Sequence, residues 1–270
     1  MSIRPRTEIL GLGAGSTAVV TALGRHLRGA RNWWPRPAGG LPPGQRALDA
    51  FPRFADDPLR PPPSNPEPIL RLASTGLGEI RIGLDDLRSS PFVQSRVSDF
   101  HCVTTWTARQ QTWTGVPLAD WWRAHVGSVP TDSGDFAVVR AADGYQAVFL
   151  TADLFSDDVM LAWGLNHAAL DRRHGFPLRL VSPSQYGYKN VKHVETIELC
   201  AERPAGRLGP KEHLRARVAL EERHSRIPGR LLRWPYRLVV PITAVVAERT
   251  LDRFTATNPD RSDSTTDTSG

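Results

Sequence analysis

The sequence predicts an α+β fold, because short strand patterns are interrupted by short helical patterns without the regular alternation of an α/β protein. A chain of 270 residues with 40% hydrophobic residues can bury one sizeable core. A proline-rich stretch precedes the strand patterns, and a basic stretch without them follows. We therefore expect an N-terminal helical segment (1–34), a central domain (35–204), a basic helical extension (205–254) and a disordered tail (255–270).

The first half of the central domain begins with a predicted β-hairpin. Ile69–Leu72 and Glu79–Ile82 alternate apolar and polar residues on either side of a glycine-containing turn. β-branched and aromatic residues over 97–106 predict a strand. In chain order we also expect the start of a short helix over 84–87, a turn over 113–118 and a helix over 119–125.

The second half continues with strands around a predicted Asp143-Gly144 turn. The expected elements are strands over 136–140 and 146–150, a short helix over 159–166, and strands over 178–181 and 191–199 separated by a loop. Beyond Pro204 the strand pattern stops. There we expect an amphipathic helix over 211–224 and a further helix over 231–254, broken at Pro235 and Pro241.

The net charge of +6 is concentrated near the C-terminus. Between Arg203 and Arg253 there are 12 Lys and Arg against 5 Asp and Glu, a local net of +7. Such a segment suits an anionic membrane, an acidic partner or an ordinary solvated helix surface. We expect a peripheral membrane or acidic-partner contact through residues 205–254, and no nucleic-acid partner.

The uncharged stretch Ile9–Gly24 is too short for a typical transmembrane helix. Arg25 follows it, where a signal peptide would show a small-residue cleavage site. We therefore expect a cytoplasmic protein, with membrane association as an open alternative. The two cysteines, Cys102 and Cys200, fit a reducing compartment.

Three common site motifs are not supported by their context. The glycines at 11, 13 and 15 follow no predicted strand, so helix packing explains them better than nucleotide binding. The histidines at 167, 174 and 193 lack the spacing of zinc ligands. The chain also has no Gly-x-Ser-x-Gly elbow of a serine hydrolase.

Cys102 is the first candidate for chemistry, because it lies at a predicted strand end within Asp99–Trp106. It is either a buried structural thiol, a thiolate nucleophile or a ligand for a soft metal. Cys200 ends a strand pattern and is expected to be an inert thiol.

A second candidate is a basic cluster formed by Arg172–Arg179 and the glycine-containing loop Tyr186–Lys192. Arginine, lysine and backbone N–H groups together can bind a phosphate. The alternative is a solvated basic loop.

Taken together, these segments resemble the molybdopterin-dependent oxidoreductases of the sulfite oxidase family. Phe100–Leu118 contains Cys-Val-x-x-Trp followed by Trp-Thr-Gly-x-Pro-Leu, which is similar to that family's molybdenum-ligating segment. His174–Glu198 contains His-Gly-x-Pro-x-Arg and Tyr-Gly-x-Lys-x-Val-Lys, which is similar to its pterin segment. Asp158–Asn166 resembles its intervening short helix. The resemblance covers residues 68–204 and implies a sulfite-oxidase-type fold of mixed sheets with short helices.

The resemblance implies a molybdenum–molybdopterin cofactor with Cys102 as the thiolate on the metal. It also implies cofactor contacts from the basic cluster, namely His174, Arg179, Lys189, Asn190, Val191 and Lys192. The implied reaction is two-electron oxygen-atom transfer to or from a small-molecule or sulfoxide-type substrate. Because no haem or flavin module is visible, we expect an external electron carrier, such as a haem or flavin protein.

The stretch after Cys102 departs from sulfite oxidases proper, which continue with Ala-Gly-Asn-Arg-Arg. Here Val103-Thr104-Thr105-Trp106 is closer to protein methionine sulfoxide reductase. A reductase of S-oxides or N-oxides is therefore the alternative enzyme, and a cofactor-free binding module that keeps the fold is the alternative of another class.

Overall fold

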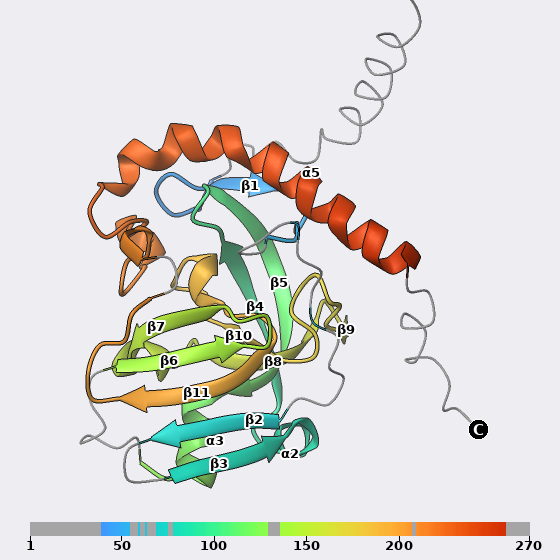
Figure 1. Cartoon of the computed structure of the whole chain (residues 1–270), viewed down its shortest axis with the longest axis vertical. Coiled ribbons are helices and arrows are strands. Elements are labelled where there is room, and N and C mark those ends of the chain that lie inside the picture. Colours follow the sequence, from blue (N-terminus) through green and yellow to red (C-terminus); the bar gives the residue numbers. More distant parts are fainter. Residues whose placement is uncertain are drawn as a thin grey trace, which may run out of the picture.

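Two mixed β-sheets form the body of the molecule, and a long C-terminal helix lies across one end (Figure 1). This computed structural model describes residues 39–54, 59, 63, 69–74, 78–128, 136–206 and 209–257. The helix expected over 1–34 lies outside the described residues, as does the expected tail beyond Thr257. The arrangement confirms the predicted α+β class.

The first sheet is built around β5 (Trp106–Pro117), which pairs with three other strands. β4 (Gln94–His101) and β8 (Met160–Leu165) run antiparallel to it, and β1 (Arg46–Leu48) runs parallel. Two short strands, β9 (Ala168–Ala169) and β10 (Arg179–Val181), extend the sheet beyond β8.

The second sheet has the strand order β3-β2-β11-β6-β7. It contains both predicted hairpins, which confirms them: β2 with β3, and β6 with β7. β11 joins the two hairpins, parallel to β2 and antiparallel to β6. The strand bounds are β2 (Ile69–Ser74), β3 (Gly78–Gly83), β6 (Phe136–Ala141), β7 (Gln146–Leu150) and β11 (Val194–Cys200).

The main core lies between the sheets and is closed by short helices. Leu72 and Phe149 from the second sheet share one cluster with Val116 and Leu161 from the first. α2 (Leu84–Arg88) confirms the predicted start of a helix, and α3 and α4 complete this layer. The remaining bounds are α3 (Leu118–His125) and α4 (Thr151–Leu154).

A second apolar cluster fills the other face of the first sheet, and this explains one wrong prediction. β8 was expected to be a helix, but it is a strand buried on both faces. Leu161 joins the main core, whereas Met160 and Ala162 join the second cluster. A strand covered on both sides reads as a continuous apolar run, which periodicity alone does not distinguish from a buried helix.

β5 accounts for two further corrections. The strand expected over 97–106 is interrupted at 102–105, where the chain turns from β4 into β5. The turn expected over 113–118 belongs instead to β5 and to the start of α3. Gly115 serves a close strand contact, because a Cβ there would lie 2.0 Å from the carbonyl oxygen of Leu161.

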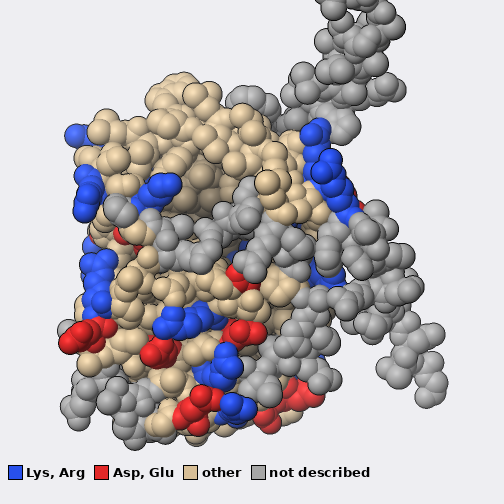
Figure 2. Space-filling view, viewed as in Figure 1, with Lys and Arg blue, Asp and Glu red and all other residues tan. Residues whose placement is uncertain are grey.

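The C-terminal extension differs from its prediction in two respects. Residues 211–224 form no α-helix, only the 3₁₀ turns η4 (Gly209–Lys211) and η5 (Val218–Leu220). After η6 (Gly229–Leu232), α5 runs unbroken over Arg233–Thr257. Pro235 lies in its first turn, where a backbone donor is not needed, and Pro241 is accommodated inside the helix. At the end of the molecule where α5 lies, the surface seen in Figure 2 is largely uncharged and is flanked by groups of Lys and Arg.

Within the described residues, no helix combines the length and apolarity needed to span a membrane.

Candidate functional site

Cys102 lies in the tight turn that connects β4 to β5. Its backbone N–H donates to the carbonyl of Trp106 at 2.8 Å, and its carbonyl accepts from the N–H of Thr105 at 3.1 Å. Thr105 adopts a positive φ of 77°, a conformation that is uncommon for a residue other than glycine. Gln45, before β1, donates a further hydrogen bond to the Cys102 carbonyl at 3.2 Å. Three hydrogen bonds therefore fix the Cys102 backbone, and with it the starting point of the side chain.

The Cys102 side chain is buried, and its Sγ lies 3.1 Å from the hydroxyl of Thr104. Burial raises the pKa of this thiol, and the Thr104 hydrogen bond and the nearby charges of Arg223 and Lys192 only partly oppose that. A free cysteine nucleophile needs a lowered pKa. A bound metal, in contrast, deprotonates a coordinating thiol outright. The buried Cys102 thiol therefore lacks the lowered pKa of an activated cysteine nucleophile.

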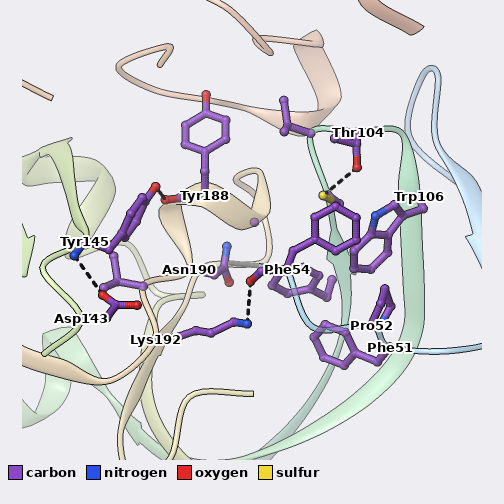
Figure 3. A pocket seen from close by; sticks show the side chains of 15 residues that line it. Phe51, Pro52, Phe54, Thr104, Trp106, Asp143, Tyr145, Tyr188, Asn190 and Lys192 are labelled. Atoms are coloured by element: carbon purple, nitrogen blue, oxygen red, sulfur yellow. Dashed lines mark hydrogen bonds between the residues drawn. The ribbon is translucent and has the colours of Figure 1, made fainter. Parts of the chain in front are cut away.

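Cys102 opens onto a cavity of about 210 Å³ whose lining is mostly apolar (Figure 3). One wall comes from the chain before β2, and the opposite wall comes from the β6–β7 turn and the loop before β11. Tyr145 links the parts of that opposite wall, because its hydroxyl donates to the carbonyl of Tyr188 at 2.7 Å. The lining residues are Phe51, Pro52, Phe54, Phe100, Cys102, Val103, Thr104, Trp106, Asp143, Tyr145, Gly187, Tyr188, Asn190, Val191 and Lys192.

Lys192 and Arg179 place two cations beside this cavity. The Lys192 ammonium donates to the carbonyls of Phe54 at 2.7 Å and Arg173 at 2.8 Å. The Arg179 guanidinium is fully buried and donates to the carbonyls of His174 at 2.7 Å and Asn190 at 3.4 Å. Among the described residues, no carboxylate forms an ion pair with either cation. Their direct hydrogen-bond acceptors are thus neutral carbonyls, while Asp171 acts on both cations and Asp143 on Lys192 from a longer distance.

Burial lowers the pKa of both groups. The pKa of Lys192 falls to about 7, first through desolvation and then through repulsion from Arg179 and Arg53. Desolvation lowers the pKa of Arg179 to about 9. Cation–π contacts partly offset the desolvation of the Arg179 charge, since its guanidinium lies 4.8 Å from the ring centre of Trp113 and 5.4 Å from that of Phe100.

The other predicted site residues surround the cavity unequally. Asn190 and Val191 line it, and the Asn190 side chain pins the loop by accepting from the N–H of Ser182 at 2.8 Å. His174 lies behind Phe51, to whose carbonyl its Nε2 is hydrogen-bonded at 3.0 Å. Lys189 is buried outside the cavity lining, where it forms an ion pair with Glu212 at 2.8 Å. The charge of Lys189 is therefore already neutralised by the protein.

Two glycines allow the backbone to close around this site. A Cβ on Gly187 would lie 2.7 Å from the ring of Phe100, the residue that separates the cavity from Arg179. Gly175 has a φ of +113°, and a Cβ there would lie 3.0 Å from the Cβ of Lys192. Larger residues at either position would force these segments apart.

Several residues of the site carried no recognisable signal in the sequence. Phe51 and Phe54 lie in the proline-rich stretch before the strand patterns, and their place at the cavity appears only through contacts with distant segments. Arg223 is fully buried and donates to the carbonyl of Val103, directly after Cys102. The pKa of Tyr236 on α5 is raised, mainly by burial. A charge on Cys102 raises it further, so the two side chains lie close together.

The sequence matches known proteins over the same central region. The profile of the family described as "Oxidoreductase molybdopterin binding domain" matches residues 70–208. "Uncharacterized oxidoreductase YuiH" of Bacillus subtilis is 30% identical over 125 residues, covering 46% of this chain and 61% of the relative. The catalytic subunit MsrP of the protein-methionine-sulfoxide reductase of Gluconobacter oxydans is 30% identical over 152 residues, covering 50% of this chain and 48% of the relative.

A shorter match links the chain to sulfite oxidase of Arabidopsis thaliana, with 41% identity over 56 residues that cover 21% of this chain and 14% of the relative. Among solved structures, the sulfane dehydrogenase SoxCD of Paracoccus pantotrophus matches with a TM-score of 0.48 and 19% identity, over 65% of this chain and 48% of that one. The chain spans about half the length of several curated relatives. Because the family profile covers more than half of the chain, the protein belongs to the molybdopterin-binding oxidoreductase family.

Proposed function

We propose that this protein holds a molybdenum–molybdopterin cofactor through Cys102 and catalyses oxygen-atom transfer with a small sulfur or nitrogen compound. The observation that carries the proposal is a buried thiol on the wall of a cavity that Lys192 also lines, with Arg179 behind Phe100, and neither cation forms an ion pair with a carboxylate among the described residues. A soft thiolate suits the metal, and the cations suit the phosphate of the pterin.

The residues present fit such a cofactor in their chemistry. Arg179 and Lys192 donate only to neutral carbonyls, so an anion could satisfy their charged forms better, whereas Lys189 has its own carboxylate. The cavity of about 210 Å³ is smaller than the 300–1,000 Å³ common for ligand sites. We propose that Phe51–Phe54 moves outward on binding, which releases Lys192 from the Phe54 carbonyl and frees its ammonium for the phosphate.

The cofactor supplies the two-electron redox chemistry and the exchange of an oxygen atom, while the protein orients and encloses it. The β4–β5 turn holds the Cys102 sulfur in place, and His174 acts indirectly by fixing the Phe51 wall. The loop of Asn190 and Val191 supplies backbone and side-chain contacts. Lys189 and Glu212 support that loop from behind.

The substrate site next to Cys102 favours an uncharged oxide over sulfite. Val103 and Thr104 line the cavity there, together with the rings of Phe100 and Trp106, and none of them carries a charge. Sulfite is an anion, and the cations nearest Cys102, Arg223 and Lys192, already donate to backbone carbonyls. Reduction of a sulfoxide or N-oxide consumes two electrons and two protons and releases water, and we propose that an external electron carrier supplies the electrons.

The cofactor assignment is tested by Cys102→Ser, with Cys200→Ser as the matched control. Both proteins are purified from a host that makes molybdopterin, and molybdenum and pterin are measured. We expect the control to match wild type and Cys102→Ser to lose turnover while keeping its melting temperature. Full activity of Cys102→Ser refutes the ligand role, and wild-type protein without molybdenum or pterin supports the cofactor-free binding module instead.

The substrate class is tested with redox dyes on the metal-loaded protein. A reduced viologen dye reports on dimethyl sulfoxide, methionine sulfoxide and trimethylamine N-oxide, and ferricyanide reports on sulfite. We expect turnover with at least one of the uncharged oxides and little with sulfite. Efficient sulfite oxidation without oxide reduction contradicts the proposed preference and returns the protein to the sulfite-oxidase-like reaction.

A further inference from the structure

The C-terminal extension carries an exposed apolar stripe. Of the large hydrophobic side chains exposed in the described residues, most lie between Leu220 and Ile242. On η6 and α5, Leu231, Trp234, Leu238 and Ile242 follow at intervals of three and four residues, so they project from one side of the helix. They are 62%, 71%, 66% and 67% exposed. We call these four residues the apolar stripe.

The opposite side of α5 is fixed to the protein. Val240, Ala244, Ala247 and Leu251 are buried, and Val240 joins the apolar cluster beneath the first sheet. Glu248 anchors the same side, accepting from the backbone N–H of Arg53 at 3.0 Å. The helix therefore presents its stripe outward from a firmly seated position rather than as a loose tail.

The charges around the stripe are mostly positive, although Glu221 pairs with Arg233. From residue 224 to residue 247 the sequence contains four arginines and no Asp or Glu. Arg226 and Arg230 are exposed next to the stripe, and Arg237 lies with its guanidinium 5.7 Å from the Trp234 ring centre. Figure 2 shows this uncharged edge with basic groups at its sides, while the acidic side chains on that face gather mostly toward the opposite end.

We propose that the apolar stripe docks this protein onto an anionic membrane surface, with α5 lying in the plane of the interface. Exposed Trp and Leu flanked by arginine are the composition of an interfacial helix, in which apolar contact and attraction to anionic lipid add together. A second copy of the chain is a poorer occupant, because a two-fold contact through this face brings the identical arginines of both copies together.

Such docking would also place the cavity close to the membrane. Arg223, just before η6, contacts the Val103 carbonyl next to Cys102, and Arg237 of α5 donates to the Gly44 carbonyl at 3.4 Å. Donors or substrates that partition into the bilayer would thus arrive near the site. The docking surface itself does not depend on the chemistry proposed for Cys102, so either can fail without the other.

The test is co-sedimentation of the full chain with protein-free vesicles of phosphatidylcholine, with and without phosphatidylglycerol. The double variant Leu238→Glu/Ile242→Glu should bind at least about tenfold more weakly than wild type. Val97→Glu is the matched control, because Val97 is also 66% exposed but lies on β4. Equal binding of wild type and the double variant, or no binding of wild type to the anionic vesicles, overturns the proposal.

A second pair of variants tests whether arginines next to the apolar stripe attract the protein to anionic lipid. Arg226→Glu/Arg230→Glu should weaken binding to anionic vesicles near 0.1 M salt and much less at 1 M, because the Debye length falls from about 10 Å to about 3 Å. Arg71→Glu/Arg81→Glu makes the same charge change on exposed side chains of the second sheet. Equal loss in both pairs shows a non-specific charge effect and contradicts a docking face at α5.

A spectroscopic measurement covers the case in which the double variant folds poorly. In a Cys200→Ser background, an environment-sensitive fluorophore is attached at Leu238→Cys or, as a control, at Val97→Cys. Anionic vesicles should shift the emission to the blue at position 238 and leave position 97 unchanged. Light scattering that shows a dimer abolished by Leu238→Glu/Ile242→Glu would assign the face to a second copy and overturn membrane docking.

Discussion

Lys192→Met should make the cofactor-free protein more stable at pH 6 and, at the same time, less able to retain the cofactor. The lysine is half-buried, and its ammonium is met by two carbonyls rather than a carboxylate. Its pKa falls from 10.5 to about 7, so the charged form is disfavoured in the folded protein. Methionine keeps a similar volume and removes the charge.

The magnitude follows from the pKa. At about 1.36 kcal/mol per pKa unit, a fall from 10.5 to about 7 corresponds to roughly 5 kcal/mol against the folded state when the lysine is charged in both states. The variant also loses two hydrogen bonds to carbonyls, and each loss reduces its gain by about 1 kcal/mol. Partial exposure of the lysine lowers the original penalty further, because solvent screens the charge. We therefore expect a net gain of about 1–3 kcal/mol at pH 6.

The pH dependence has a definite sign. Below pH 7 both folded and unfolded chains hold the proton, and the full penalty applies. As the pH rises above the folded value of about 7, the folded protein releases the proton while the unfolded chain keeps it up to about 10.5, so the penalty shrinks. The advantage of Lys192→Met should therefore be largest at pH 6 and nearly absent at pH 9.

The assay is urea unfolding of both proteins, made in a host without molybdopterin, at pH 6 and pH 9. Pterin content after purification from a competent host is measured in parallel. A variant that is less stable than wild type at pH 6 would show that Lys192 is a structural hydrogen-bond donor. A variant that retains the pterin fully would refute its phosphate role.

Three further predictions concern the walls of the site. Arg179→Met should lower pterin retention about ten- to a hundredfold, since a charge-assisted hydrogen bond contributes about 1.5–3 kcal/mol; wild-type pterin content after purification contradicts this. Gly187→Ala should cost about 1–3 kcal/mol of unfolding free energy, because its Cβ would lie 2.7 Å from a phenylalanine ring, whereas Gly39→Ala, with nothing within 4 Å, should be nearly neutral. Glu212→Gln should lower the free energy of unfolding by about 3–5 kcal/mol, because it leaves the buried Lys189 without its carboxylate partner. The control Asp120→Asn, in an exposed ion pair, should change it little, and equal unfolding midpoints of the two variants would contradict the prediction.

The sequence was most informative where a structural unit is local. Both hairpins were predicted because each consists of two alternating strands and a turn within about fifteen residues. Four residues that the family resemblance implies as site residues, Cys102, Asn190, Val191 and Lys192, line the cavity, and each lies within one of two contiguous motifs. In these cases the residues that interact are also close in the sequence.

Sequence patterns are less informative where a residue's environment is set by distant segments. Lys189 and Lys192 lie three residues apart in one loop and look equivalent in the sequence. Glu212 neutralises Lys189, while Lys192 turns to the Phe54 carbonyl, 138 positions away. The apolar run of β8 predicts a helix for a related reason, because only the packing on both of its faces distinguishes this strand from a buried helix.

The C-terminal extension shows how far such long-range contacts reach. The sequence suggested a domain ending near residue 204, with a charged helix attached. In the structure Glu212 compensates a lysine behind the cavity wall, and Arg223 holds the carbonyl next to Cys102. Both side chains are buried, so removing the extension would leave Lys189 without its counter-charge and the Cys102 turn without a support. The extension therefore supports the loop beside the cavity and the Cys102 turn, and α5 is placed where one side completes the core and the other faces outward.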